Sequence, residues 1–112
     1  MFSIVRTAAI PIIALLLAAC STVQVGRDFD VRSLEMKIER GITTQNQVRA
    51  WLGAPTGSGV SVDTGGERFD EWTYYFASGK LPGMSNAKVK ILQVKFDKQG
   101  IVRGYNWSTS DQ

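Results

Sequence analysis

The clearest hydrophobic pattern in the chain lies in residues 44–52 and predicts a short amphipathic helix. Its apolar positions recur at the i, i+3, i+4 spacing of a single helix face: Val48, Trp51 and Leu52. Thr44 stands three residues before Gln47, the spacing of a capping box that satisfies free backbone N–H groups. Gly53 and Pro55 then predict the end of the helix. Because a helix of about two turns is marginal alone in water, its apolar face must pack on a larger element.

A second helical pattern precedes the first one. Asp30 can cap a helix whose apolar positions are spaced for one face: Val31, Leu34 and Ile38. Gly41 predicts its end, and only residues 41–43 connect the two helices. So short a connection predicts that the helices pack as neighbours and share one cover.

Alternation of apolar and polar residues predicts strands over residues 69–77, 88–97 and 101–107, with a turn at 97–100. The first strand carries an aromatic stripe that we expect to face the helices: Trp72, Tyr74 and Phe76. Residues 55–66 are rich in Gly, Ser and Thr and are expected to form a surface loop. The predicted fold class is α+β, with two short helices packed on one face of a three-stranded antiparallel sheet, in the order helix-helix-strand-strand-strand.

The N-terminal residues predict a targeting segment. Residues 1–19 combine Arg6, an apolar core and small residues at the end, which is typical of a signal peptide. Leu17-Ala18-Ala19-Cys20 resembles the bacterial lipobox, in which the cysteine thiol is acylated after cleavage. An ordinary cleavage site beside a chance cysteine is the alternative. We therefore predict a signal peptide at 1–19, a lipidated tether at 20–29 that begins with Cys20, and a folded domain at 30–112.

Charge and composition exclude several function classes. The net charge of +3 is modest, and no concentrated basic face of the kind that nucleic-acid binders carry is apparent in the sequence. The chain has no histidine, which removes Ser-His-Asp triads, Cys-His dyads and most zinc sites. The acidic residues Asp63, Glu67, Asp70 and Glu71 lack the spacing of a calcium loop. We expect no enzyme activity, no cofactor, no metal and no nucleic-acid partner.

Candidate binding residues lie on the face of the sheet that the predicted helices do not cover. If the aromatic stripe faces the helices, Tyr75 lies on the open face of the sheet, and Trp107 is expected to join it there. Cross-strand stacking of these two rings is the alternative explanation. The hairpin at 78–86 adds Lys80 with two apolar residues that have no apparent core role, Leu81 and Met84. These five residues form the predicted partner-binding surface.

Several motifs in this order resemble one family. They are the lipobox at 17–21, the helix-turn-helix from Ile38 to Val48 with Leu52-Gly53-Ala54-Pro55, the strand Trp72-Thr73-Tyr74-Tyr75-Phe76, and Val94-Lys95-Phe96-Asp97 before Gly100-Ile101-Val102. Together they resemble the BamE (SmpA/OmlA) lipoproteins. Ile42 replaces the more usual Met, a conservative apolar change.

The resemblance implies a lipid-anchored protein of the outer membrane with its domain in the periplasm. It implies an accessory scaffold subunit of the machinery that assembles and inserts β-barrel proteins, with other subunits of that complex as partners. Anionic phospholipid is a further candidate partner, although Ala77 stands where a cation would help to bind it. An envelope stress lipoprotein of the osmotically inducible type, or a periplasmic enzyme inhibitor of related fold, is the alternative function.

Overall fold

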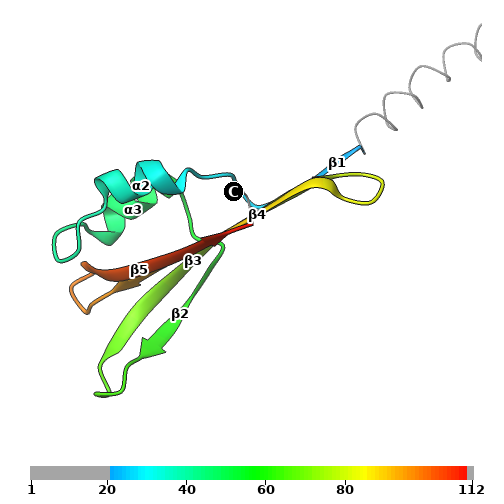
Figure 1. Ribbon diagram of the computed structural model, residues 1–112. Coiled ribbons are helices and arrows are strands. Elements are labelled where there is room, and N and C mark those ends of the chain that lie inside the picture. Colours follow the sequence, from blue (N-terminus) through cyan, green and yellow to red (C-terminus); the bar gives the residue numbers. More distant parts are fainter. Residues whose placement is uncertain (1–20, 111–112) are drawn as a thin grey trace, which may run out of the picture.

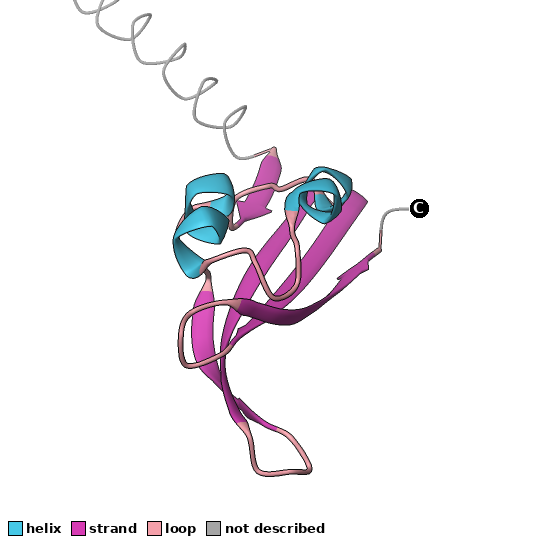
Figure 2. Cartoon of the chain, turned by 90° about the vertical axis from the view of Figure 1, so that its left-hand side faces the viewer, coloured by secondary structure: helices cyan, strands magenta, loops and turns pink. Residues whose placement is uncertain are grey.

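The computed structural model describes residues 21–110, which form a five-stranded antiparallel sheet with two helices on one face (Figures 1 and 2). Along the chain the elements are β1 (Thr22–Val25), α2 (Val31–Lys37), α3 (Gln45–Leu52), β2 (Gly57–Val62), β3 (Arg68–Lys80), β4 (Ser85–Phe96) and β5 (Val102–Thr109). The strand order is β1-β3-β4-β5, and β2 also pairs with β3. The α+β class is confirmed. The predicted signal peptide and Cys20 lie outside the described residues.

Both helices begin as their sequences predict. The Asp30 side chain accepts the backbone N–H groups of Arg32 and Ser33 at the start of α2. Thr44 and Gln47 form the predicted capping box of α3, with Gln47 N–H to Thr44 Oγ1 at 3.2 Å and Thr44 N–H to Gln47 Oε1 at 3.0 Å. Gly53 follows α3 with a φ of 81°, a value that favours glycine. The two helix starts are therefore fixed by local hydrogen bonds.

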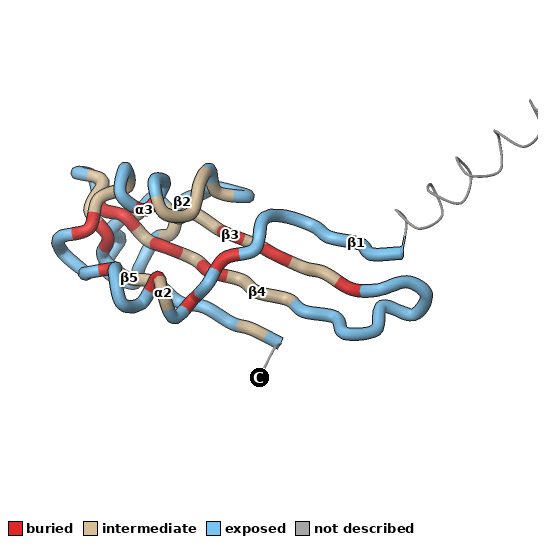
Figure 3. Tube along the Cα trace, turned by 90° about the horizontal axis from the view of Figure 1, so that it is seen from above, coloured by how far each residue is buried: buried red, intermediate tan, exposed pale blue. Residues whose placement is uncertain are grey.

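The core lies between the helices and the middle of β3 and β4 (Figure 3). Its fully buried side chains come from α3, β4 and β5: Val48, Leu92, Val94, Phe96 and Val102. Tyr74 and Phe76 are each only 4% exposed on the helix side, and Trp72 packs edge-on against Phe96. The predicted orientation of the aromatic stripe is thus confirmed.

A hydrogen bond from the core ties β3 to the end of α3. The hydroxyl of Tyr74 donates to the carbonyl oxygen of Gly53 at 2.9 Å. Burial raises the pKa of Tyr74 to about 12, so the phenol stays protonated and remains a donor at neutral pH.

The sheet contains two strands more than the three predicted, because β3 extends beyond its aromatic segment. Thirteen residues of β3 offer an edge on which β2 pairs with Arg68–Thr73 and β1 pairs with residues 77–80. The expected surface loop at 55–66 thus contains β2, and the expected tether contains β1. Phe29, also assigned to the tether, lies in the core.

The turn between β4 and β5 is organised by a buried carboxylate. Asp97 Oδ1 accepts the backbone N–H groups of Gln99 and Ile101 at 2.9 and 3.0 Å, and Oδ2 accepts Arg103 Nε at 2.8 Å. These hydrogen bonds, with that from Ile101 contributing most, lower the pKa of Asp97 below its ordinary value of 3.8. The ionised carboxylate therefore stabilises the folded state.

Leu92→Ala is expected to lower the free energy of unfolding by about 2–5 kcal/mol, because Leu92 is fully buried and its loss leaves a cavity. Leu81→Ala is the matched control, since Leu81 is 46% exposed, and a change within about 0.5 kcal/mol is expected there. Denaturant unfolding of residues 21–112 measures both. Equal losses in the two variants would contradict this placement of the core.

Asp97→Asn is expected to lower the unfolding midpoint at neutral pH. Because the folded-state pKa is lowered, the carboxylate stabilises the fold above the ordinary pKa, and this contribution is lost as the pH falls through the folded-state value. The gap between parent and variant should therefore close in acid. Thermal unfolding at a series of pH values tests this, with Lys98→Gln in the same turn as control. A gap that stays constant in acid would contradict the assignment.

Candidate functional site

The end of the sheet nearest Ser21 extends beyond the helices as an arm (Figure 1). The arm consists of β1, the end of β3 and the start of β4, and its tip is the turn Leu81–Met84 between the last two. Thr22 pairs with Lys80, and the backbone N–H of Leu81 donates to the carbonyl oxygen of Ser21 at 2.8 Å. The tip of the arm and the start of the described chain therefore lie side by side.

The open face of the arm is apolar. Residues paired across an antiparallel sheet share a face, and Ala77 pairs with both Val25 and Val89, while Tyr75 pairs with Ile91. Val25 is 52% exposed, and the other four are half-buried. We call these five residues, together with Val23, the apolar arm face. Its contiguous apolar residues are of the kind that mark interaction sites.

The open face turns polar away from the tip. Thr73, Gln93 and Asn106 form one row across β3, β4 and β5, and Glu71 pairs with Lys95 in the next row. Gln93 Nε2 donates to Glu71 Oε1 at 3.1 Å. Apolar residues are thus concentrated in the half of the open face that lies nearest Ser21.

The helix-side face of the arm carries lysines. Lys88 pairs with Ser78 and Lys90 with Phe76, so both lie on the face opposite the apolar arm face. Lys90 Nζ donates to Asp28 Oδ1 at 2.8 Å and to the carbonyl oxygen of Phe29 at 2.9 Å. The hydrogen bond from Lys90 lowers the pKa of Asp28. Lys90 therefore fastens the segment before α2 to the base of the arm.

Gly26 lets the chain pass close to β3 as it leaves the arm. Its φ is 78°, and a Cβ at this position would collide with the carbonyl oxygen of Tyr75. The backbone N–H of Tyr75 donates to Thr56 Oγ1 at 3.1 Å. The Tyr75 backbone thus lies between the Thr56 hydroxyl, which accepts its N–H, and the Gly26 backbone, which passes close to its carbonyl oxygen.

The domain model of the outer membrane protein assembly factor BamE matches residues 33–106, about two thirds of the chain. The chain belongs to the BamE family. Comparison with curated proteins gave no match. The matched BamE domain runs from α2 to β5 and includes the tip of the arm, whereas β1 lies outside the matched residues.

The five predicted binding residues occupy three places in and around this BamE domain. Tyr75 lies on the open face, as expected. Lys80 is the last residue of β3, and Leu81 and Met84 begin and end the tip, with 46% and 43% exposure. A Cβ on Gly79 would lie 2.5 Å from Met84 Cε, so the Met84 side chain folds back over Gly79.

The expectation that Trp107 lies on the open face was wrong. Trp107 pairs with Leu92, a core residue, and therefore lies on the helix side at the sheet edge. Its Nε1–H donates to Glu35 Oε1 of α2 at 2.6 Å, and the ring remains 45% exposed. Tyr105 pairs with Val94 and packs against the core on the same side. The alternation of β5 alone could not show which of its faces is covered.

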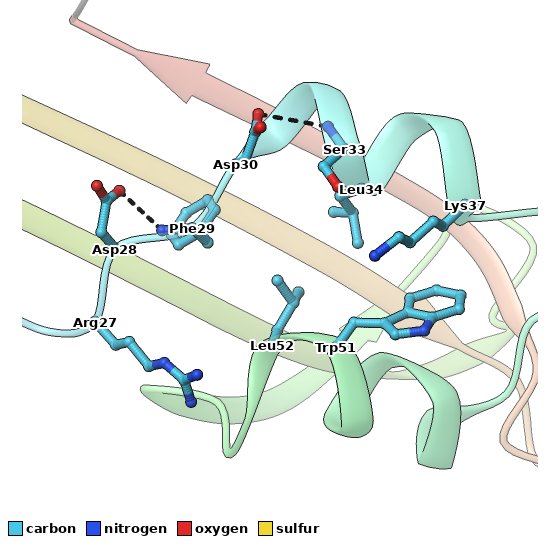
Figure 4. A pocket seen from close by; sticks show the side chains of 9 residues that line it. All are labelled: Arg27, Asp28, Phe29, Asp30, Ser33, Leu34, Lys37, Trp51 and Leu52. Carbon is cyan, nitrogen blue, oxygen red and sulfur yellow. Dashed lines mark hydrogen bonds between the residues drawn. The ribbon is translucent and has the colours of Figure 1, made fainter.

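A cleft of about 260 Å³ lies between the two helices of the BamE domain (Figure 4). Its apolar lining comes from Phe29, Leu34, Trp51 and Leu52, and Arg27 and Lys37 lie at its opposite ends. Lys37 Nζ lies 5.9 Å from the ring centroid of Trp51, a cation–π contact. The two carboxylates that line the cleft accept hydrogen bonds from backbone N–H groups: Asp28 accepts Phe29 N–H, and Asp30 caps α2. The cleft thus holds structural contacts.

The described part of the BamE domain contains no group of three or more His, Cys, Asp or Glu side chains that could hold a metal ion.

The sequence analysis did not predict that Val25, Val89 and Ile91 belong to the apolar arm face. A signal was present, because Val23 and Val25 alternate with polar residues, and so do Val89 and Ile91. The pattern could not show that these side chains meet on one face, since this depends on how β1 and β4 pair with β3.

Proposed function

We propose that the protein is an outer-membrane lipoprotein that serves as a non-catalytic accessory subunit of the machinery that inserts β-barrel proteins. The observation that carries this proposal is the BamE family match over residues 33–106. Cys20 is proposed as the acylated residue after removal of residues 1–19, with the domain on the periplasmic side of the membrane. Acylation at several positions of one residue exceeds the single chain that gives only reversible membrane binding.

The apolar arm face is proposed as the contact surface for another subunit of that machinery. Tyr75 supports this role because a half-buried tyrosine combines a large apolar ring with a polar hydroxyl and loses little side-chain entropy on binding. Ile91 lies opposite Tyr75 on β4, and Val25 pairs with Ala77, the next residue of β3 on this face, so apolar area that a partner could cover adjoins the ring. Trp107 is a second candidate contact at the β5 edge, since its ring is exposed although its Nε1–H is already bonded.

Cys20→Ser is expected to leave an unlipidated protein that no longer partitions with outer membranes, because the acylated thiol is removed. Membrane fractionation and mass spectrometry of the intact protein measure this. Ser21→Thr, which keeps the cysteine, is the control and should remain in the membrane fraction. Unchanged mass and partitioning of the Cys20 variant would contradict the proposed anchor.

Tyr75→Ala is expected to weaken the affinity for the assembly subunits by about 2 kcal/mol, or roughly thirtyfold, if Tyr75 is a central contact residue. Co-purification from detergent extracts, followed by titration with the retained subunit, measures the loss. Gln93→Ala on the polar half of the same face is the matched control. Thermal unfolding should show that both variants remain folded.

Trp107→Phe, tested in the same way, separates the two candidate surfaces. Normal retention by the Tyr75 variant with loss by the Trp107 variant would move the contact to the β5 edge. If the parent protein retains no assembly subunit while its anchor is intact, the accessory-subunit function is contradicted. That outcome would favour the stress-lipoprotein or inhibitor alternative.

A further inference from the structure

The tip of the arm lies next to the position that the proposed anchor would occupy. Leu81 N–H bonds to the carbonyl oxygen of Ser21, and Cys20 precedes Ser21 directly in the chain. Consecutive Cα atoms are about 3.8 Å apart, so an acyl group on Cys20 starts within about one residue of this bond. The tip therefore cannot be far from the bilayer once the anchor is inserted.

The chemistry of the tip suits the boundary between headgroups and acyl chains. Residues 81–84 are Leu, Pro, Gly and Met, with no charged side chain, and Leu81 and Met84 are exposed. Lys80 and Lys88 lie just behind the tip on the arm. Apolar side chains flanked by lysines are the arrangement that interfacial segments use, in which the apolar residues are buried and the cations remain at headgroup level.

Two apolar side chains alone would bind a membrane only weakly. Attachment through Cys20 changes this, because the second contact becomes intramolecular and its effective concentration is high. Val23, the residue of the apolar arm face nearest the tip, pairs with Gly79 beside Met84 and marks where the partner surface ends. A weak insertion is thus sufficient when the anchor is already in the bilayer.

We infer that Leu81 and Met84 insert into the membrane interface as a second contact beside the acylated Cys20. This assigns the tip to lipid, whereas the open face around Tyr75 takes the protein partner. The inference rests on the proposed acylation of Cys20. It also gives the domain a defined orientation, with the arm directed at the bilayer and the polar half of the sheet directed away from it.

The test uses the full-length acylated protein in vesicles of phosphatidylethanolamine and phosphatidylglycerol that contain lipids with brominated acyl chains. Leu81→Cys provides a single thiol for an environment-sensitive fluorophore, because Cys20 is the natural chain's only cysteine and acylation blocks its thiol. Lys98→Cys, in the turn at the opposite end of β4, is the matched control. We expect the bromolipids to quench most of the emission at position 81 and to leave position 98 unchanged.

Two further measurements define the chemistry of the contact. Adding Met84→Glu to the Leu81→Cys variant should abolish the quenching while the protein stays in the vesicles. Replacing the anionic lipid with phosphatidylcholine should leave the quenching intact, since the contact is apolar. Quenching that requires phosphatidylglycerol would overturn the inference in favour of lysine–headgroup attraction.

Failure of this inference can be distinguished from failure of the proposed role in barrel assembly. Equal, weak quenching at positions 81 and 98 overturns the inference, even if the protein co-purifies with assembly subunits. A probe at position 81 that is shielded only when those subunits are added would show that the tip binds protein, and this also overturns it. Strong quenching at position 81 without any co-purified subunit supports the membrane contact and contradicts the proposed partner.

Discussion

The length of β3 is the constraint on which the rest of this structure depends. Of its thirteen residues, 70–78 and Lys80 pair with β4 along one edge, while the other edge receives β2 and then β1. The helices cover only the middle of this strand, and therefore the end near Ser21 projects as an arm with both faces accessible. If β3 ended at Phe76, β1 would have no partner strand, and the tip would not project beyond the helices.

The parts of the fold that the sequence could predict are those governed by local hydrogen bonds and by periodicity. Thr44 with Gln47 and Asp30 with the next turn are complete local signals, and the stripe of Trp72, Tyr74 and Phe76 has the strand period of two. These features lie in the right places because few long-range contacts are needed to specify them.

The parts that could not be predicted depend on pairing between distant segments. β2 reads Gly-Ser-Gly-Val-Ser-Val, and its exposed small residues give no amphipathic signal, so only the free edge of β3 makes it a strand. Trp107 was assigned to the wrong face because its position depends on the register with Leu92. The same limitation applied to the candidate site: Tyr75 could be placed from its own strand, whereas its neighbours Val25 and Ile91 come from two other strands.

The pairing of β1 with β3 also determines how mechanical load passes through the molecule. A force applied at Thr22 along the strand axis, away from the helices, acts on the β1–β3 hydrogen bonds in shear, so they share the load. Gly26 and the Lys90–Asp28 ion pair continue this connection to the start of α2. A load on the N-terminal end of β1 is consequently borne by paired backbone hydrogen bonds of the sheet, and not by an unpaired linker.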